Sequence, residues 1–259
     1  MLRPRIIPCL LVHKGGLVKT INFKKPKYVG DPINSVRIFN EKLVDELIVL
    51  DIDATINNTE PNYKLISNLA NECRMPICYG GGIKTAAQAK KIISLGVEKV
   101  AISSAAIDTP MLITEIASEI GRQSVVVVLD AKKRLFSQSY DVCTHNAKKN
   151  TKRCVIEVSK QFESLGAGEI VINSIDLDGG MRGYDLSLAS QVRESVCVPI
   201  TILGGAGRLD DIENVFNHCG LVGAAAGSLF VFKGAYRAVL INYPNMKQRD
   251  ELIAKVFSH

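Results

Sequence analysis

Short apolar runs rich in β-branched residues alternate along the chain with longer stretches whose apolar positions recur every three or four residues. The short runs are typical of buried strands, and the longer stretches predict amphipathic helices, for example at residues 85–95 and 209–217. A glycine near the end of each helix, Gly96 or Gly220, suits a helix C-terminus. Strands are expected at residues 6–12, 46–52, 77–80, 97–103, 125–130, 169–174, 200–203 and 221–226. Eight strands that alternate with helices predict an α/β fold with a parallel sheet.

The second half of the chain repeats the pattern of the first. Small residues after the third and fourth strands recur after the seventh and eighth strands at a constant offset of 124 positions, and residues of the second strand recur in the sixth at an offset of 123. A repeat of this kind indicates two copies of one structural unit. The matching pairs are Gly80 with Gly204, Gly81 with Gly205, Gly96 with Gly220, Ser104 with Ser228, Glu46 with Glu169, and Asp53 with Asp176.

Two halves of four strands predict one closed (β/α)8 TIM barrel, for which about 250 residues is a usual size. An open doubly wound sheet is the competing fold, but no G-x-G-x-x-G loop follows the first strand. We therefore expect a single barrel domain over residues 1–259. Its half-barrels should span about 1–122 and 123–245, and a C-terminal helix should follow at 246–259.

The composition fits a soluble protein with a large core, since 47% of residues are hydrophobic and 22% are charged. No apolar run approaches the roughly 20 residues needed to cross a bilayer. The apolar run that begins at Ile6 is too short for a secretion signal. We therefore expect a cytoplasmic protein without a membrane partner.

The seven cysteines form no C-x-x-C pair, and the four histidines show no paired metal-ligand spacing. An odd number of cysteines in an intracellular chain argues against a disulfide framework. We expect no bound metal and no other cofactor.

Positive charge gathers at residues 24–27 and 148–153 in a chain of net charge +6. These clusters are either two solvated loops or an attraction for an anionic small ligand. Nucleic acid is disfavoured as a partner, because aromatic residues for base stacking are not interleaved with the lysines.

Glycines and serines follow the third, fourth, seventh and eighth predicted strands, where a barrel of this type binds its ligands. Small residues let backbone N–H groups approach an anion closely, and serine hydroxyls add further donors. Glycines that merely make tight turns are the alternative, but recurrence of the pattern in both halves favours two phosphate cradles. Because the cradles should lie on opposite sides of the barrel mouth, they predict a long ligand with an anionic group at each end.

Five aspartates stand at or just beyond strand ends and are candidates for acid–base chemistry: Asp51, Asp53, Asp130, Asp176 and Asp178. Asp130 is the strongest candidate, because it ends an apolar strand in which an unpaired carboxylate would be costly. A structural role as a strand-end cap is its alternative. In the repeat, the counterpart of Asp130 in the first half is Leu11, which is not a carboxylate.

Four charged residues stand at the starts of strands, at the opposite end of the barrel: Arg5, Glu46, Lys99 and Glu169. Two positive and two negative groups there could neutralise one another in a ring. From the residues alone, we interpret this ring as a stabilising salt-bridge layer.

Several ordered motifs, among them RIIPCL, DELIVLDI, YGGGIKT, GAGEIVINSIDLDGGMRGYD, LGGAG and GSLFVF, resemble the cyclase subunit of imidazole glycerol phosphate synthase over essentially the whole chain. The resemblance implies a barrel of the ribulose-phosphate-binding type. It also implies a bis-phosphorylated ribulosyl aminoimidazole carboxamide nucleotide as ligand. Ammonia would come from a glutaminase subunit on the N-terminal face of the barrel and pass through its interior.

Site residues follow from the same resemblance. It assigns Asp130 and Lys19 to catalysis, Lys19 within a mobile first loop. The four charged residues named above become a gate for ammonia rather than a salt-bridge layer alone. The implied substrate and phosphate contacts are Gly82, Ser103, Ser104, Asp178, Gly179, Gly205, Gly227 and Ser228.

The chain departs from the family pattern at Leu11, where the resemblance implies a second catalytic aspartate. Leucine neither gives nor takes a proton, and loss of a general acid or base typically costs about 10²–10⁴-fold in rate. Further departures are HKGG before LVKT, and residues 144–146 after the fifth strand. The stretch from PCLLVHKGG to LDIDAT is more similar to a branch of cyclase-like paralogues that accompany surface-polysaccharide genes.

In that branch an acetamido sugar becomes an acetamidino sugar, and the barrel works with a glutaminase-like subunit and an ATP-dependent sugar amidotransferase. Our first hypothesis is accordingly an ammonia-conducting subunit of a glutamine-dependent system that amidinates a sugar for lipopolysaccharide or another surface glycan. The second is a histidine-pathway cyclase that uses Asp51 or Asp53 as its second carboxylate. The third is a non-catalytic scaffold that binds a bis-phosphate ligand and a partner.

Overall fold

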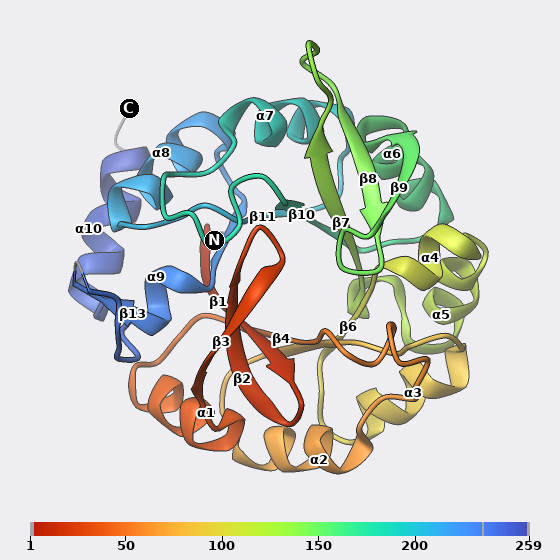
Figure 1. The fold of residues 1–259 in the computed structure, drawn as a ribbon, viewed down its shortest axis with the longest axis horizontal. Helices are drawn as coiled ribbons and strands as arrows, with labels where there is room; N and C mark the ends of the chain where they lie inside the picture. The colour runs from red at the N-terminus through yellow and green to blue at the C-terminus, as the bar shows by residue number, and fades with distance from the viewer. Residues whose placement is uncertain (1–2, 235, 258–259) are drawn as a thin grey trace.

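A computed structural model describes residues 3–234 and 236–257 and contains a closed barrel of eight parallel strands, which confirms the predicted fold class (Figure 1). The barrel closes because β10 pairs with β7 and β12 pairs with β1. In their order around the barrel, the strands are β1 (Arg5–His13), β4 (Leu47–Asp51), β5 (Ile77–Gly80), β6 (Lys99–Ile102), β7 (Val125–Lys133), β10 (Glu169–Ser174), β11 (Ile200–Leu203) and β12 (Gly223–Ala226).

A ring of helices surrounds the strands (Figure 1). Four of them begin with a side-chain cap: Asp31, Asn62, Thr85 and Asp185 each accept a hydrogen bond from the backbone N–H three residues later. The main helices are α1 (Pro32–Glu41), α2 (Tyr63–Glu72), α3 (Ala86–Ser94), α5 (Leu112–Ile120), α6 (Val155–Leu165), α7 (Leu186–Ser195) and α8 (Leu209–Cys219).

Predicted and observed boundaries differ by at most three residues. The fourth strand was expected at 97–103 and is shorter, because Ser103 already precedes the short helix α4 (Ser104–Asp108). The strands β1 and β7 run beyond their expected ends, because each continues into an antiparallel pairing outside the barrel.

Those pairings form two hairpins that the strand pattern did not predict. The first consists of β2 (Gly16–Ile21) and β3 (Lys24–Gly30), and the second of β8 (Tyr140–Thr144) and β9 (Lys149–Cys154). Each half of the chain therefore begins with a barrel strand, a hairpin and a helix, as a repeat would require. The division into half-barrels near residue 122 stays a prediction.

Buried apolar side chains form two layers. The larger layer fills the space between the strands and the surrounding helices, and includes the fully buried Phe39, Phe162 and Phe216. The second layer lies inside the barrel and is built from small and medium side chains: Ile7, Cys9, Ile48, Cys78, Ala101, Val126, Val128, Val171, Leu203 and Ala225.

The C-terminal segment fastens the starts of β1 and β4. The Tyr243 hydroxyl donates to the Ile6 carbonyl at 2.8 Å, and Asp45 Oδ2 accepts the Ile6 N–H at 3.0 Å. Arg249 of α10 (Met246–Phe257) lies 2.6 Å from Asp45 Oδ1. This helix occupies the position expected for a C-terminal helix; residues 258–259 lie outside the described part of the chain. None of the described helices combines the length and apolarity that a membrane span requires.

Candidate functional site

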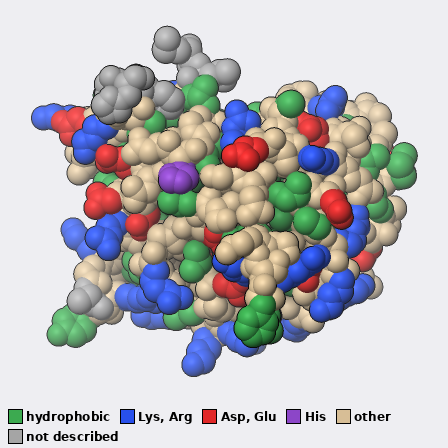
Figure 2. Space-filling view, turned by 90° about the horizontal axis from the view of Figure 1, so that it is seen from above, with side chains coloured by type: hydrophobic (Ala, Val, Ile, Leu, Met, Phe, Trp, Pro, Cys, Tyr) green, Lys and Arg blue, Asp and Glu red, His purple; other side chains and the backbone are tan. Residues whose placement is uncertain are grey.

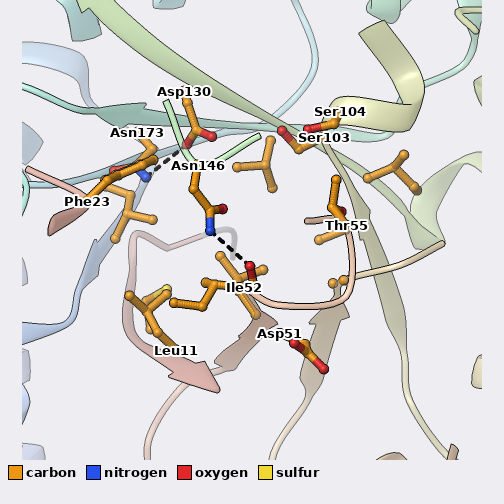
Figure 3. Close-up of a pocket in the computed structure, with 18 of the residues that line it drawn as sticks. Leu11, Phe23, Asp51, Ile52, Thr55, Ser103, Ser104, Asp130, Asn146 and Asn173 are labelled. Carbon is orange, nitrogen blue, oxygen red and sulfur yellow. Dashed lines mark hydrogen bonds between the residues drawn. The ribbon is translucent and has the colours of Figure 1, made fainter. Parts of the chain in front are cut away.

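A cavity of about 520 Å³ opens at the C-terminal ends of the barrel strands (Figure 3). Its walls come from the segments that follow the strands in both halves. All ten residues that we predicted as mouth contacts line it: Lys19, Gly82, Ser103, Ser104, Asp130, Asp178, Gly179, Gly205, Gly227 and Ser228. The fold thus brings together residues up to about 200 positions apart.

In the first half, the cradle lies between the segment after β5 and the segment after β6. Gly82 has φ +74°, and a Cβ there would meet the Thr59 carbonyl oxygen at 2.8 Å. Ser103 caps no N–H among the described residues, so its hydroxyl is available to a ligand. The neighbouring Ser104 hydroxyl accepts the His145 N–H at 3.1 Å. The arrangement can present hydroxyls and backbone groups to an anion.

In the second half, the chain packs even more closely. Gly205 has φ +110°, and a Cβ there would lie 2.0 Å from the Gly183 carbonyl oxygen. A Cβ on Gly227 would meet the Lys19 ammonium at 2.3 Å. Ser228 follows directly and begins the short helix α9 (Ser228–Val231). A side chain at either glycine would therefore collide with the Gly183 backbone or with Lys19, and the wall of the cavity would have to shift.

Lys19 and Asp178 meet at this side of the cavity. Lys19 lies in β2 rather than in an irregular loop, and only 6% of its surface is exposed. Its ammonium donates to the Cys9 carbonyl. Burial lowers the pKa of Lys19, and the charge of Asp178 partly opposes this. Burial raises the pKa of Asp178, which accepts the Thr20 hydroxyl at 2.8 Å. The two residues bring an amine and a carboxyl group to the lining of the cavity.

Asp130 is the titratable group best suited to proton transfer. Burial raises its pKa to about 7, although a hydrogen bond from Asn173 opposes the shift. Leu11 lies on the opposite side of the cavity (Figure 3). The cavity therefore holds an acid–base group that titrates near neutral pH, and an apolar side chain stands at the position expected for its partner.

Of the other three aspartate candidates, one lines the cavity and two do not. Asp51 lines the cavity, and its Oδ1 accepts the N–H groups of Asp53 and Ala54 at 2.9 and 3.2 Å. Burial raises the pKa of Asp51. Asp53 instead accepts from the Lys14 N–H at 2.7 Å and lies 2.7 Å from His13 Nδ1, and it does not line the cavity. Asp176 accepts the Lys133 N–H at 3.0 Å and is also outside the lining. These two hold loops rather than face a ligand.

Asn173 and Asn146 are among the lining residues that were not predicted as contacts. Asn173 stands in register with Asp130 on the neighbouring strand, a relation that only the pairing of β7 with β10 reveals. Asn146 reaches across the mouth, and its amide donates to the Ile52 carbonyl at 2.9 Å (Figure 3). Asn146 belongs to a stretch of three left-handed residues, 145–147, which had been noted only as a departure from the family pattern.

At the other end of the barrel, the four predicted gate residues form a closed ring. Arg5 contacts both carboxylates: it pairs with Glu46, and its Nη2 lies 2.7 Å from Glu169 Oε1. Lys99 Nζ lies 2.8 Å from Glu46 and 2.9 Å from Glu169. The charges therefore alternate around the opening, and each cation bridges both anions.

Electrostatics favour the charged forms of three of these groups, Glu169, Arg5 and Lys99. Burial alone would raise the pKa of Glu169, but Arg5 and Lys99 outweigh it and lower that pKa to about 2. Burial works against the charged form of Arg5 and Lys99, but the two carboxylates raise both pKa values. The ring is thus a neutral, tightly paired layer, beyond which lies the apolar interior of the barrel. An apolar interior of this kind admits a small neutral molecule far more readily than an ion.

Among the described residues, no three His, Cys, Asp or Glu side chains are grouped so that they could hold a metal ion.

Comparison with known proteins gives one consistent result. The family described as "Histidine biosynthesis protein" matches residues 5–237. A Vibrio vulnificus protein named "Putative imidazole glycerol phosphate synthase subunit hisF3" is 56% identical over 253 residues, which cover 98% of this chain and 97% of that protein. A Pseudomonas aeruginosa protein of the same name, numbered hisF2, is 52% identical over 250 residues, covering 96% and 99% of the two chains. The imidazole glycerol phosphate synthase subunit HisF of Lactococcus lactis is 40% identical over 230 residues, 89% of each chain.

Proposed function

Because the chain belongs to the histidine biosynthesis protein family, we propose that it is the ammonia-conducting, cyclase-like subunit of a glutamine-dependent amidotransferase system. In this proposal, a glutaminase subunit docks on the N-terminal face, and ammonia enters through the ring of Arg5, Glu46, Lys99 and Glu169. The cavity at the other end retains a phosphorylated ligand. The system amidinates a sugar, converting an acetamido to an acetamidino group for a surface glycan.

The observation that carries the proposal is that Leu11 lies on the opposite side of the cavity from Asp130. Cyclisation of the histidine-pathway nucleotide, as the family resemblance implies it, uses two carboxylates. Here one wall offers a carboxylate with a pKa near 7, and the facing wall offers a hydrocarbon. Ammonia delivered to such a cavity would meet a weakened cyclase, so we infer that it serves a further acceptor.

The degree of similarity supports a paralogue rather than the histidine-pathway enzyme. Relatives that are 52–56% identical carry names qualified as putative, two of them also numbered, whereas relatives named without that qualification are near 40% identical. The word subunit in all of these names also supports a partner for this chain.

An assay of the purified protein tests the proposal. With the bis-phosphorylated ribulosyl aminoimidazole carboxamide nucleotide and an ammonium salt, we expect no cyclised product from the unmodified chain. Leu11→Asp should restore some product, and Leu11→Asn, which matches it in size without a titratable group, should not. Robust turnover by the unmodified protein would contradict the proposal.

A second candidate function is the histidine-pathway cyclase itself, with Asp51 as the second carboxylate. Its support is that Asp51 lines the cavity and has a raised pKa, whereas Asp53 does not line it. Growth of a histidine auxotroph that lacks its own cyclase subunit, rescued by this chain and not by its Asp51→Asn variant, would favour this function over the first.

A further inference from the structure

The two hairpins beside the cavity mouth carry a concentrated net positive charge. We call residues 14–30 the first hairpin and residues 132–153 the second hairpin. Together they contain twelve Lys and Arg residues and one Asp, a balance of +11 against +6 for the whole chain, so the remaining sequence is net negative. In the side view of Figure 2, Lys and Arg side chains gather along the lower edge, which corresponds to the mouth side of the barrel.

The same hairpins expose large apolar side chains. On the first hairpin, Ile21 and Tyr28 are 46% and 65% exposed; at the tip of the second, Leu135 and Phe136 are 87% and 106% exposed. Single exposed apolar residues are common on protein surfaces. Here they stand on two projections around one opening, and exposed apolar groups with a polar rim are typical of an interaction surface.

The two projections rise from opposite walls of the cavity. The first hairpin pairs with the end of β1, where Leu11 opposes Val18. The second pairs with the end of β7, where Asp130 opposes Cys143, and it stands out from the barrel in Figure 1. A partner that touches both tips would therefore lie over the cavity.

The proposed function, on which this inference rests, requires such a cover. If the barrel does not consume ammonia, the ammonia must leave by the mouth. In water at neutral pH it would be protonated to ammonium, which is no longer a nucleophile. The acceptor site must therefore join the cavity without intervening bulk water.

We propose that the mouth face docks the enzyme that consumes the ammonia, through an acidic surface around the entrance to its active site. Lysines of both hairpins pair with that surface and speed the encounter, and the apolar tips, Phe136 above all, insert into it. An anionic bilayer would also attract basic and apolar projections. The protein partner is favoured because the projections surround a polar opening from which ammonia must be received.

The test uses three purified proteins: this chain, its glutaminase subunit and the ATP-dependent sugar amidotransferase of the same organism. The double variant Leu135→Asp/Phe136→Asp should raise the Kd between barrel and amidotransferase at least tenfold. It should reduce amidination driven by glutamine to a similar degree and leave amidination driven by ammonium chloride unchanged. The control is Ile38→Asp, an exposed apolar residue on the outer helix α1, which should change neither quantity.

Equal Kd values and equal glutamine-driven rates for the double variant and the unmodified chain would overturn the docking inference. So would binding of the unmodified chain to vesicles of phosphatidylcholine with 30% phosphatidylglycerol that the double variant loses, since the surface would then be a membrane anchor. A lack of amidination with either nitrogen source would instead contradict the proposed function.

Discussion

The side-chain amide of Asn173 donates a hydrogen bond of 3.0 Å to Oδ1 of Asp130, and the two residues stand in register on the adjacent strands β10 and β7. The bond favours the ionised carboxylate, whereas burial favours the protonated form. Burial prevails, and the pKa of Asp130 rises to about 7. Asp130 can therefore exchange protons near neutral pH, at a cost in stability once it ionises.

Asp130→Asn should stabilise the fold in a pH-dependent way. The folded-state pKa, about 7, lies above the ordinary value of 3.8, so the unmodified chain loses stability as pH rises between these values. The variant does not titrate there. One pKa unit corresponds to about 1.4 kcal/mol, and since the carboxyl borders an open cavity we expect a gain of about 2 kcal/mol at pH 8 and almost none at pH 4.

Urea denaturation at both pH values measures this difference. Glu194→Gln, a change at an exposed carboxyl, serves as the control and should shift neither value by more than about 0.5 kcal/mol. An equal effect of Asp130→Asn at pH 4 and pH 8 would contradict the role of burial.

Lys99→Met should destabilise the protein by about 3 kcal/mol, because it leaves Glu46 and Glu169 buried with only Arg5 between them. The matched control is Lys90→Met, which breaks the exposed pair with Glu119 and should cost less than about 0.5 kcal/mol. Both free energies of unfolding come from urea denaturation at pH 7. Similar losses for the two variants would show that the buried ring contributes no more to the free energy of unfolding than an exposed ion pair does.

Glu169→Gln should reduce the loss of folding stability at acidic pH. The pKa of Glu169 is about 2 in the folded chain against an ordinary 4.5, so its ionisation stabilises the fold above pH 4.5. That stability is lost as pH falls toward 2. The variant should be less stable at pH 7 and lose less stability between pH 5 and pH 2.5. Thermal unfolding at several pH values checks this, and parallel curves for both proteins would refute it.

Gly205→Ala should cost at least about 3 kcal/mol and weaken binding of inorganic phosphate. Its new Cβ would combine a φ of +110° with a 2.0 Å approach to the Gly183 carbonyl oxygen. Gly15→Ala isolates the backbone effect, since φ is +79° and no described atom lies within 4 Å of the added Cβ. We expect about 1 kcal/mol for that control. Urea denaturation measures the loss of stability, and calorimetric titration measures the binding of phosphate. Equal results for both variants would contradict the prediction.

The barrel and its mouth could be predicted because both follow from strand ends. Parallel strands place the residues that follow them at one edge, so Ser103 and Ser228 were expected in one cavity although 125 positions separate them. The charged ring follows from the opposite ends of the strands in the same way.

The hairpins could not be predicted, because their residues show no apolar alternation. Lys24, Lys25 and Pro26 are exposed, and β3 forms only because β2 offers it a partner. The roles of Asp51 and Asp53 could not be separated for a similar reason. Both follow one strand, but hydrogen bonds with His13 and the Lys14 N–H hold Asp53 outside the cavity lining. Such contacts depend on side-chain direction, which position along the chain does not specify.

The uneven distribution of charge gives the barrel a permanent electric dipole. Its positive pole is the mouth, where the two hairpins gather a balance of +11, and the rest of the sequence has a balance of −5 (+6 minus 11). A cation that moved from the ring at Arg5 toward the mouth would climb this potential, whereas an uncharged molecule would not feel it. The fold as a whole thus discriminates between ammonium and ammonia before any single residue does.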